Sequence, residues 1–130
     1  MAILASGSLT HRFAQNGLAP EYASKMWSPF LEQLDHHGMA MWQRADGPSF
    51  CEMLSEYATK GYGDGFMHGT AMLLGAAGWK HYDGRADVVT PFFPSSGSGQ
   101  INAALPVTPM PADLPPPGAS AASAQAGSRL

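Results

Sequence analysis

The stretch MAILASGSLTH, residues 1–11, places an apolar run before a turn of small residues and a histidine. A short apolar run that is closed by turn residues is typical of a buried strand in a parallel or mixed sheet. We therefore predict a strand over residues 1–5, followed by a turn. In α/β sheets functional groups lie just past the carboxyl ends of strands, and an imidazole there can exchange protons near neutral pH. His11 is thus a candidate for acid–base chemistry, although its position alone leaves a structural role open.

Helix signals follow this strand. Ser28 is a good N-cap residue with proline next to it, and apolar residues recur at helical spacing over residues 30–42. Gly38 is expected to end or bend this helix. Pro48 is expected to open a second helix that runs through Tyr57.

A glycine-rich segment, GYGDG at residues 61–65, separates these helices from a third. Three glycines in five residues require unusual backbone angles or close approach to another group. We expect the third helix over residues 67–77 with Gly78 as its stop, a strand over residues 86–90 and a loop over residues 94–100. This order of strands and helices predicts an α/β fold class.

The chain changes composition at Pro106, beyond which proline, alanine, serine and glycine dominate. Such a segment cannot bury enough apolar surface to offset the entropy lost on ordering. We therefore predict one domain over residues 1–107 and a disordered tail over residues 108–130.

The composition argues against several partners. The net charge is −3 and only seven residues are lysine or arginine, which excludes the basic footprint of a nucleic-acid binder. No apolar run approaches the roughly 20 residues of a membrane span, and no signal peptide is evident. A lone Cys51, expected to be a small buried hydrophobe, fits a cytoplasmic protein. Charged residues make up 13% of the chain, against about a quarter in ordinary domains, which suggests that a partner covers some of the surface.

Asp64 is the most notable acidic residue, because glycines flank it and a helix follows it. It is either a capping or turn aspartate or a metal ligand, since carboxylates are normal ligands of Fe(II) and Mn(II). His68 lies four residues further on and could line the same pocket. His36 and His37 are adjacent, so they cannot chelate one metal from one helix face, and a solvated or interface role is expected. The remaining histidine follows the third helix, where a cation suits the helix dipole.

Four collinear segments of the chain resemble the class III, or LigB-like, extradiol ring-cleavage dioxygenases. The segments are LASGSLTHRF (residues 4–13), FCEMLSEYA (residues 50–58), GDGFMHGTAMLLG (residues 63–75) and SSGSGQINA (residues 95–103). The resemblance covers residues 1–107 and corresponds to the C-terminal part of the catalytic domain. It implies a mixed-sheet α/β fold with flanking helices.

The resemblance also implies an activity. Family members cleave a catechol next to its diol, using O2 and one non-haem Fe(II) that two histidines and one carboxylate bind. This implies oxidative extradiol (meta) cleavage of 3,4-dihydroxyphenylacetate or a similar catechol, with Mn(II) as an alternative metal. By the same likeness His11 is the catalytic acid/base, Asp64 is the metal ligand and His68 is a substrate-pocket residue. For the full-length protein we expect a homo-oligomer.

The sequence departs from the family pattern in three ways. The two ligand histidines of the family belong to its N-terminal half, so the chain alone is expected to lack turnover. Asp64 stands where the family usually has glutamate, which is longer by one methylene, or about 1.5 Å. Thr10 replaces a usual serine, and Gly69 replaces an aspartate. A non-catalytic partner subunit or degenerate paralogue is therefore the alternative to an enzyme fragment, and a small stand-alone metal-binding protein is a third.

Overall fold

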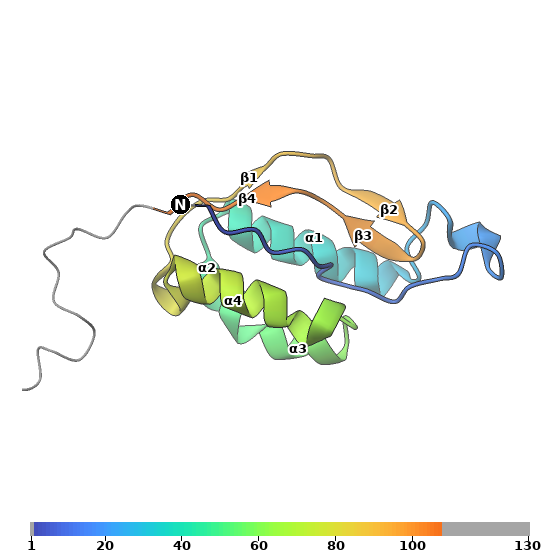
Figure 1. Ribbon diagram of the computed structural model, residues 1–130, viewed down its shortest axis with the longest axis horizontal. Coiled ribbons are helices and arrows are strands. Elements are labelled where there is room, and N and C mark those ends of the chain that lie inside the picture. The colour runs from blue at the N-terminus through green and yellow to red at the C-terminus, as the bar shows by residue number, and fades with distance from the viewer. Residues whose placement is uncertain (1, 108–130) are drawn as a thin grey trace, which may run out of the picture.

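The structure is a computed structural model, which describes residues 2–107, so the predicted tail lies outside the described residues. Figure 1 shows the strands along one side of α1 and the helices α3 and α4 along the other. The described residues form four α-helices and four short strands: α1 (Pro29–Gln43), α2 (Gly47–Glu52), α3 (Leu54–Thr59), α4 (His68–Ala77), β1 (Asp87–Val88), β2 (Phe93–Ser95), β3 (Ser98–Gln100) and β4 (Ala103–Ala104). Three single-turn 3-10 helices accompany them: η1 (Pro20–Tyr22), η2 (Asp64–Met67) and η3 (Trp79–His81).

Helix α1 begins as the sequence predicts. The side chain of Ser28 accepts a hydrogen bond from the backbone N–H of Leu31, and a proline occupies the first helical turn. Of the two outcomes expected at Gly38, an end or a bend of the helix, the end is wrong, since α1 continues to Gln43. Glycine is needed there for packing instead, because a Cβ at Gly38 would lie 2.6 Å from the hydroxyl oxygen of Tyr57.

The predicted second helix is divided into α2 and α3 at Met53. Asp46 caps α2 by accepting a hydrogen bond from the backbone N–H of Ser49 at 3.3 Å. Phe50 and Tyr57, one from each helix, are fully buried with their ring centroids 5.3 Å apart. Burial of each such ring contributes roughly 1.5–3 kcal/mol. The core of the domain therefore includes residues of α1, α2 and α3, and Leu74 of α4 belongs to the same buried cluster.

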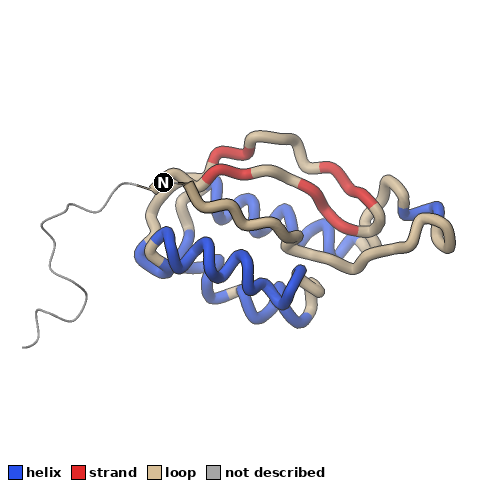
Figure 2. Tube along the Cα trace, viewed as in Figure 1, coloured by secondary structure: helices blue, strands red, loops and turns tan. Residues whose placement is uncertain are grey.

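The strand expected over residues 1–5 is not formed over residues 2–5, the part of it that the structure describes. Within the described residues, residues 2–7 make no backbone hydrogen bond to another segment, and Figure 2 shows them as an extended loop. An apolar run becomes a strand only when a neighbouring strand pairs with it. Leu4 is 94% exposed, so this run is also not buried.

The predicted strand over residues 86–90 is confirmed as β1, which pairs antiparallel with β4. The loop expected over residues 94–100 is wrong, because β2 and β3 form an antiparallel hairpin there. Ser96 and Gly97 connect the two strands, and both have positive φ values (52° and 85°), as type I′ hairpin turns require. Helices with small sheets confirm the α/β class, but both ladders are antiparallel, so the described residues contain no mixed sheet.

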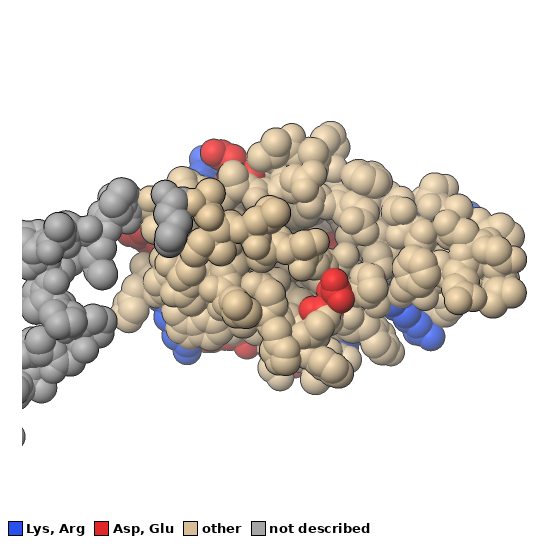
Figure 3. Space-filling view, in the orientation of Figure 1, with Lys and Arg blue, Asp and Glu red and all other residues tan. Residues whose placement is uncertain are grey.

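An apolar groove of about 670 Å³ lies between the N-terminal segment, α4 and β4. On the face that Figure 3 shows, charged side chains are sparse, in line with the low charge of the sequence. Met72 of α4 is 75% exposed, which adds to the uncovered apolar surface. That a partner covers such surface stays a prediction. Among residues 2–107, no helix combines the length and apolar character that crossing a membrane requires.

Candidate functional site

One surface hollow, about 490 Å³ in volume, brings together two of the three predicted site residues, His11 and Asp64. It lies where the N-terminal turn meets the glycine-rich segment and the end of α3. The lining residues are His11, Ala58, Thr59, Tyr62, Gly63, Asp64, Gly65 and Phe66.

Two backbone hydrogen bonds explain why these distant residues meet. The N–H of His11 donates to the carbonyl of Gly61 at 3.1 Å, and the N–H of Asp64 donates to the carbonyl of Ser8 at 3.0 Å. Residues 8–11 therefore run alongside residues 61–64 in the manner of a short antiparallel ladder. This pairing fixes the two backbones that carry the imidazole and the carboxylate.

Glycine at position 63 permits this close approach. A Cβ there would lie 3.0 Å from the carbonyl oxygen of Leu9 and would clash with the side chain of Met67. The predicted requirement for close approach is thus confirmed at Gly63. The backbone is also strained before and after Gly63 and Asp64, since Tyr62 and Phe66 have φ values of 57° and 53°. Such conformations are uncommon outside glycine, and they concentrate at functional sites.

Exposed aromatic rings border the hollow. Tyr62 is 52% exposed and Phe66 is 74% exposed, although both line the same concave surface as His11. The His11 ring also stacks with Phe13, at a centroid distance of 6.2 Å and an interplanar angle of 23°. Aromatic side chains beside a few polar groups are typical of sites that bind a flat, partly polar small molecule.

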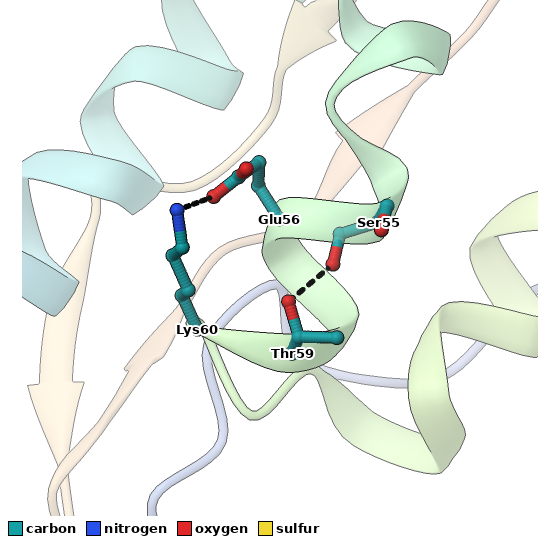
Figure 4. Close-up of polar contacts among 4 residues, drawn as sticks. All are labelled: Ser55, Glu56, Thr59 and Lys60. Carbon is teal, nitrogen blue, oxygen red and sulfur yellow. Dashed lines mark hydrogen bonds and ion pairs between the residues drawn. The ribbon is translucent and has the colours of Figure 1, made fainter.

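The C-terminal end of α3 forms one wall of the hollow, and local contacts hold it in place (Figure 4). The Thr59 hydroxyl donates to the carbonyl of Ser55 at 2.7 Å, and Lys60 forms an ion pair with Glu56 at 2.7 Å. The charge of Lys60 is therefore paired with that of Glu56, and Lys60 is not among the residues that line the hollow. The ion pair is exposed, so its contribution to stability is small.

The family model described as the catalytic LigB subunit of aromatic ring-opening dioxygenase matches residues 1–106. The chain belongs to the LigB family. It is also similar to the 3,4-dihydroxyphenylacetate 2,3-dioxygenase of Escherichia coli, with 42% identity over 93 residues. The matched part is 72% of this chain but 34% of that relative, so the chain spans about a third of the relative's length. The resemblance inferred from the sequence is therefore confirmed.

The donor set of this LigB chain is incomplete for a metal. Among residues 2–107, no three side chains of histidine, cysteine, aspartate or glutamate gather as a metal site. A facial triad needs three ligands, whereas the hollow offers the carboxylate of Asp64 and the imidazole of His11. Asp64 is exposed and lines the hollow, so its carboxylate is accessible to a ligand. The described residues therefore fit part of an iron site and not the whole.

The other candidate residues lie elsewhere. His68 is exposed at the start of α4 and is not among the residues that line the hollow. His36 and His37 are exposed on α1, and the ring of His36 packs against Phe92 at a centroid distance of 4.5 Å. Cys51 is buried, as predicted, and burial raises the pKa of its thiol, which keeps the sulfur neutral.

Sequence reasoning missed two features of the region. The first is the aromatic border, for which the pattern GYGDGF, with rings on both sides of the acidic residue, was an available signal. The second is Asp35, which is buried in α1 and accepts a hydrogen bond from the hydroxyl of Thr10. Burial raises the pKa of Asp35 to about 7. In the sequence Asp35 appears as one more polar residue of an amphipathic helix, so nothing in the sequence distinguished it.

Proposed function

We propose that this chain supplies the acid/base histidine and the ligand carboxylate of an extradiol ring-cleavage site for 3,4-dihydroxyphenylacetate or a similar catechol. The observation that carries the proposal is the shared hollow. His11 and Asp64 come from segments about fifty residues apart, yet backbone hydrogen bonds hold them beside one set of exposed aromatic rings.

Each residue has a distinct task in this proposal. The rings of Tyr62 and Phe66 pack against the aromatic diol and exclude water from one side of it. The imidazole of His11 accepts a proton from a catechol hydroxyl and later returns it to the product. Asp64 offers an oxygen ligand to Fe(II), or to Mn(II), which supplies the chemistry with O2 when bound. Both atoms of O2 enter the product, so the reaction needs no further reductant.

The two remaining ligands have to come from polypeptide beyond the described residues. A non-catalytic partner subunit is therefore the second candidate function, and the incomplete donor set favours it. In either role, the apolar groove and low charge fit an assembly with further polypeptide.

Oxygen consumption with Fe(II) and 3,4-dihydroxyphenylacetate tests the proposal, with the yellow semialdehyde as the second readout. The assay compares the chain alone with the chain mixed with the part of the E. coli relative that it does not match. We expect turnover only in the mixture, and its loss in both His11→Ala and Asp64→Ala. His37→Ala is the matched control, because this exposed histidine lies on α1 and does not line the hollow.

The outcomes separate the two candidates. A mixture that assembles but stays inactive favours the partner subunit. Turnover that survives both site substitutions overturns the assigned roles, and turnover by the chain alone overturns the conclusion that the described donor set is incomplete.

A further inference from the structure

Arg12 directly follows the candidate acid/base residue, and two aromatic rings hold its guanidinium. The central carbon of that group lies 4.2 Å from the ring centroid of Trp27 and 5.5 Å from that of Tyr62. Tyr62 is itself a wall of the hollow that contains His11 and Asp64. A permanent positive charge therefore stands beside the hollow, against one of its walls.

This charge is not neutralised within the described residues. The ion pairs there are Lys60 with Glu56 and Lys80 with Glu52, and neither involves Arg12. Stacking on aromatic faces uses the plane of a guanidinium and leaves the N–H donors at its edge free. Those donors match a carboxylate in a bidentate geometry, so the position suits an anionic group of a ligand.

The negative charge of Asp64 and the positive charge of Arg12 together would orient a ligand that binds in the hollow. Asp64 carries a carboxylate inside it, which repels an acidic substituent and attracts a cation. Arg12 attracts the same substituent from beside Tyr62. An aromatic acid is therefore oriented with its carboxylate toward Arg12 and away from Asp64.

We propose that Arg12 is a specificity residue that binds the carboxylate of an aromatic substrate, so that acidic catechols are preferred over neutral ones. This inference rests on the proposed function for its substrate class, but the recognition itself needs neither metal nor turnover. It goes beyond the acid/base and ligand roles, because it assigns a subsite for the substituent of the ring. The Trp27 indole, in contact with the guanidinium, is a built-in reporter of occupancy.

The test is a metal-free titration of the whole chain, in which NMR follows the indole N–H resonance of Trp27. Phenylacetate and 3,4-dihydroxyphenylacetate are the acidic probes, and 2-phenylethanol and 4-methylcatechol are the neutral ones. We expect each acid to bind about tenfold more tightly than the neutral probe of similar size, with the preference falling as salt rises. Arg12→Gln is expected to abolish the preference and Arg12→Lys to retain part of it. Arg44→Gln, which removes an exposed arginine at the end of α1, is the matched control.

Equal binding of acids and neutral probes by the unsubstituted chain overturns the proposal, as does a preference that survives Arg12→Gln. Absence of any acid-dependent shift overturns it as well. The probe and salt comparisons on the unsubstituted chain decide the matter even if Arg12→Gln unfolds. If the unsubstituted chain shows no acid preference while the mixture turns over, this inference alone is refuted. A clear preference for acids in the unsubstituted chain, without turnover in the mixture, would refute the proposed function and leave the carboxylate subsite at Arg12 supported.

Discussion

The hydroxyl of Thr10 donates a hydrogen bond of 2.9 Å to Oδ2 of Asp35, and both side chains are buried. This bond joins the turn that precedes His11 to the middle of α1. The second oxygen of Asp35, Oδ1, has no hydrogen-bond partner among the described residues. Burial disfavours the charged carboxylate, and the bond from Thr10 offsets only part of that cost, so the pKa of Asp35 rises to about 7.

The raised pKa predicts a stability that depends on pH. The folded chain holds the Asp35 proton more tightly than the unfolded chain, whose carboxyl has the ordinary value of 3.8. The stabilisation is therefore complete below pH 3.8 and is lost as pH rises toward 7. Between pH 5 and pH 8 we expect a loss of about 3 kcal/mol in the free energy of unfolding.

Urea unfolding of the chain and of Asp35→Asn at the two pH values measures this loss. Asparagine keeps the shape and still accepts a hydrogen bond from Thr10, but it cannot ionise. The variant is expected to show a markedly shallower dependence on pH. Parallel pH dependences for the two proteins would show that Asp35 is not the titrating group.

Replacing Gly38 by alanine is expected to change the free energy of unfolding in the direction opposite to that given by helix propensity. Alanine normally stabilises a helix interior by about 1 kcal/mol relative to glycine. At Gly38, however, the new Cβ would lie 2.6 Å from the Tyr57 hydroxyl, which donates to the Leu34 carbonyl at 2.7 Å. We expect Gly38→Ala to destabilise the chain by about 1–3 kcal/mol through overpacking.

Gly75→Ala is the matched control in α4, where the space around the Cβ position is open within 4 Å. It is expected to stabilise the chain by about 0.5–1 kcal/mol. Thermal unfolding followed by circular dichroism compares the two variants. Equal shifts in the same direction would contradict the role given to the contact between Gly38 and Tyr57.

These contacts show what the sequence could and could not predict. The cap at Ser28 and the proline at position 48 are local signals, so residue types alone located the starts of α1 and α2. The apolar run over residues 1–5 was misjudged because a strand depends on a partner that no local pattern reveals. The hairpin turn at residues 96–97 was local and could have been found, since a two-residue connection ending in glycine is a hairpin signal.

For the candidate site as well, local features could be predicted from the sequence and long-range contacts could not. His11 and Asp64 were singled out by the small and glycine residues around them, and the structure brings both into one hollow. Their proximity could not be read from the residues, because it depends on backbone pairing across about fifty positions. The burial of Asp35 and the placement of Arg12 against Tyr62 likewise arise from long-range packing.

Gly63 and Gly65 predict different outcomes for the same substitution. At Gly63 an alanine Cβ would clash with Met67 and lie 3.0 Å from the carbonyl oxygen of Leu9. At Gly65 the Cβ position is open, and only the positive φ of 54° opposes alanine. We expect Gly65→Ala to cost about 1–2 kcal/mol in stability, and Gly63→Ala to cost more. Urea unfolding measures both, and turnover in the mixture should fall further for Gly63→Ala, because the contacts with Met67 and Leu9 would displace the backbone that pairs residues 8–11 with Asp64.

Asp64→Glu tests whether the carboxylate is a working ligand. The resemblance implies that glutamate is usual at this position, and the longer side chain moves the carboxylate outward by about 1.5 Å. If Asp64 is a metal ligand, Asp64→Glu should retain or raise the affinity of the mixture with the E. coli fragment for Fe(II) and Mn(II). Asp64→Asn should lower that affinity by more than about tenfold, because a neutral amide is a poorer ligand. Calorimetric titration with each metal gives the affinities, and Asp83→Asn provides a control at an exposed aspartate outside the hollow. Equal metal affinity in Asp64→Asn and Asp83→Asn would remove Asp64 from the ligand set and leave the partner-subunit role as the better account of this chain.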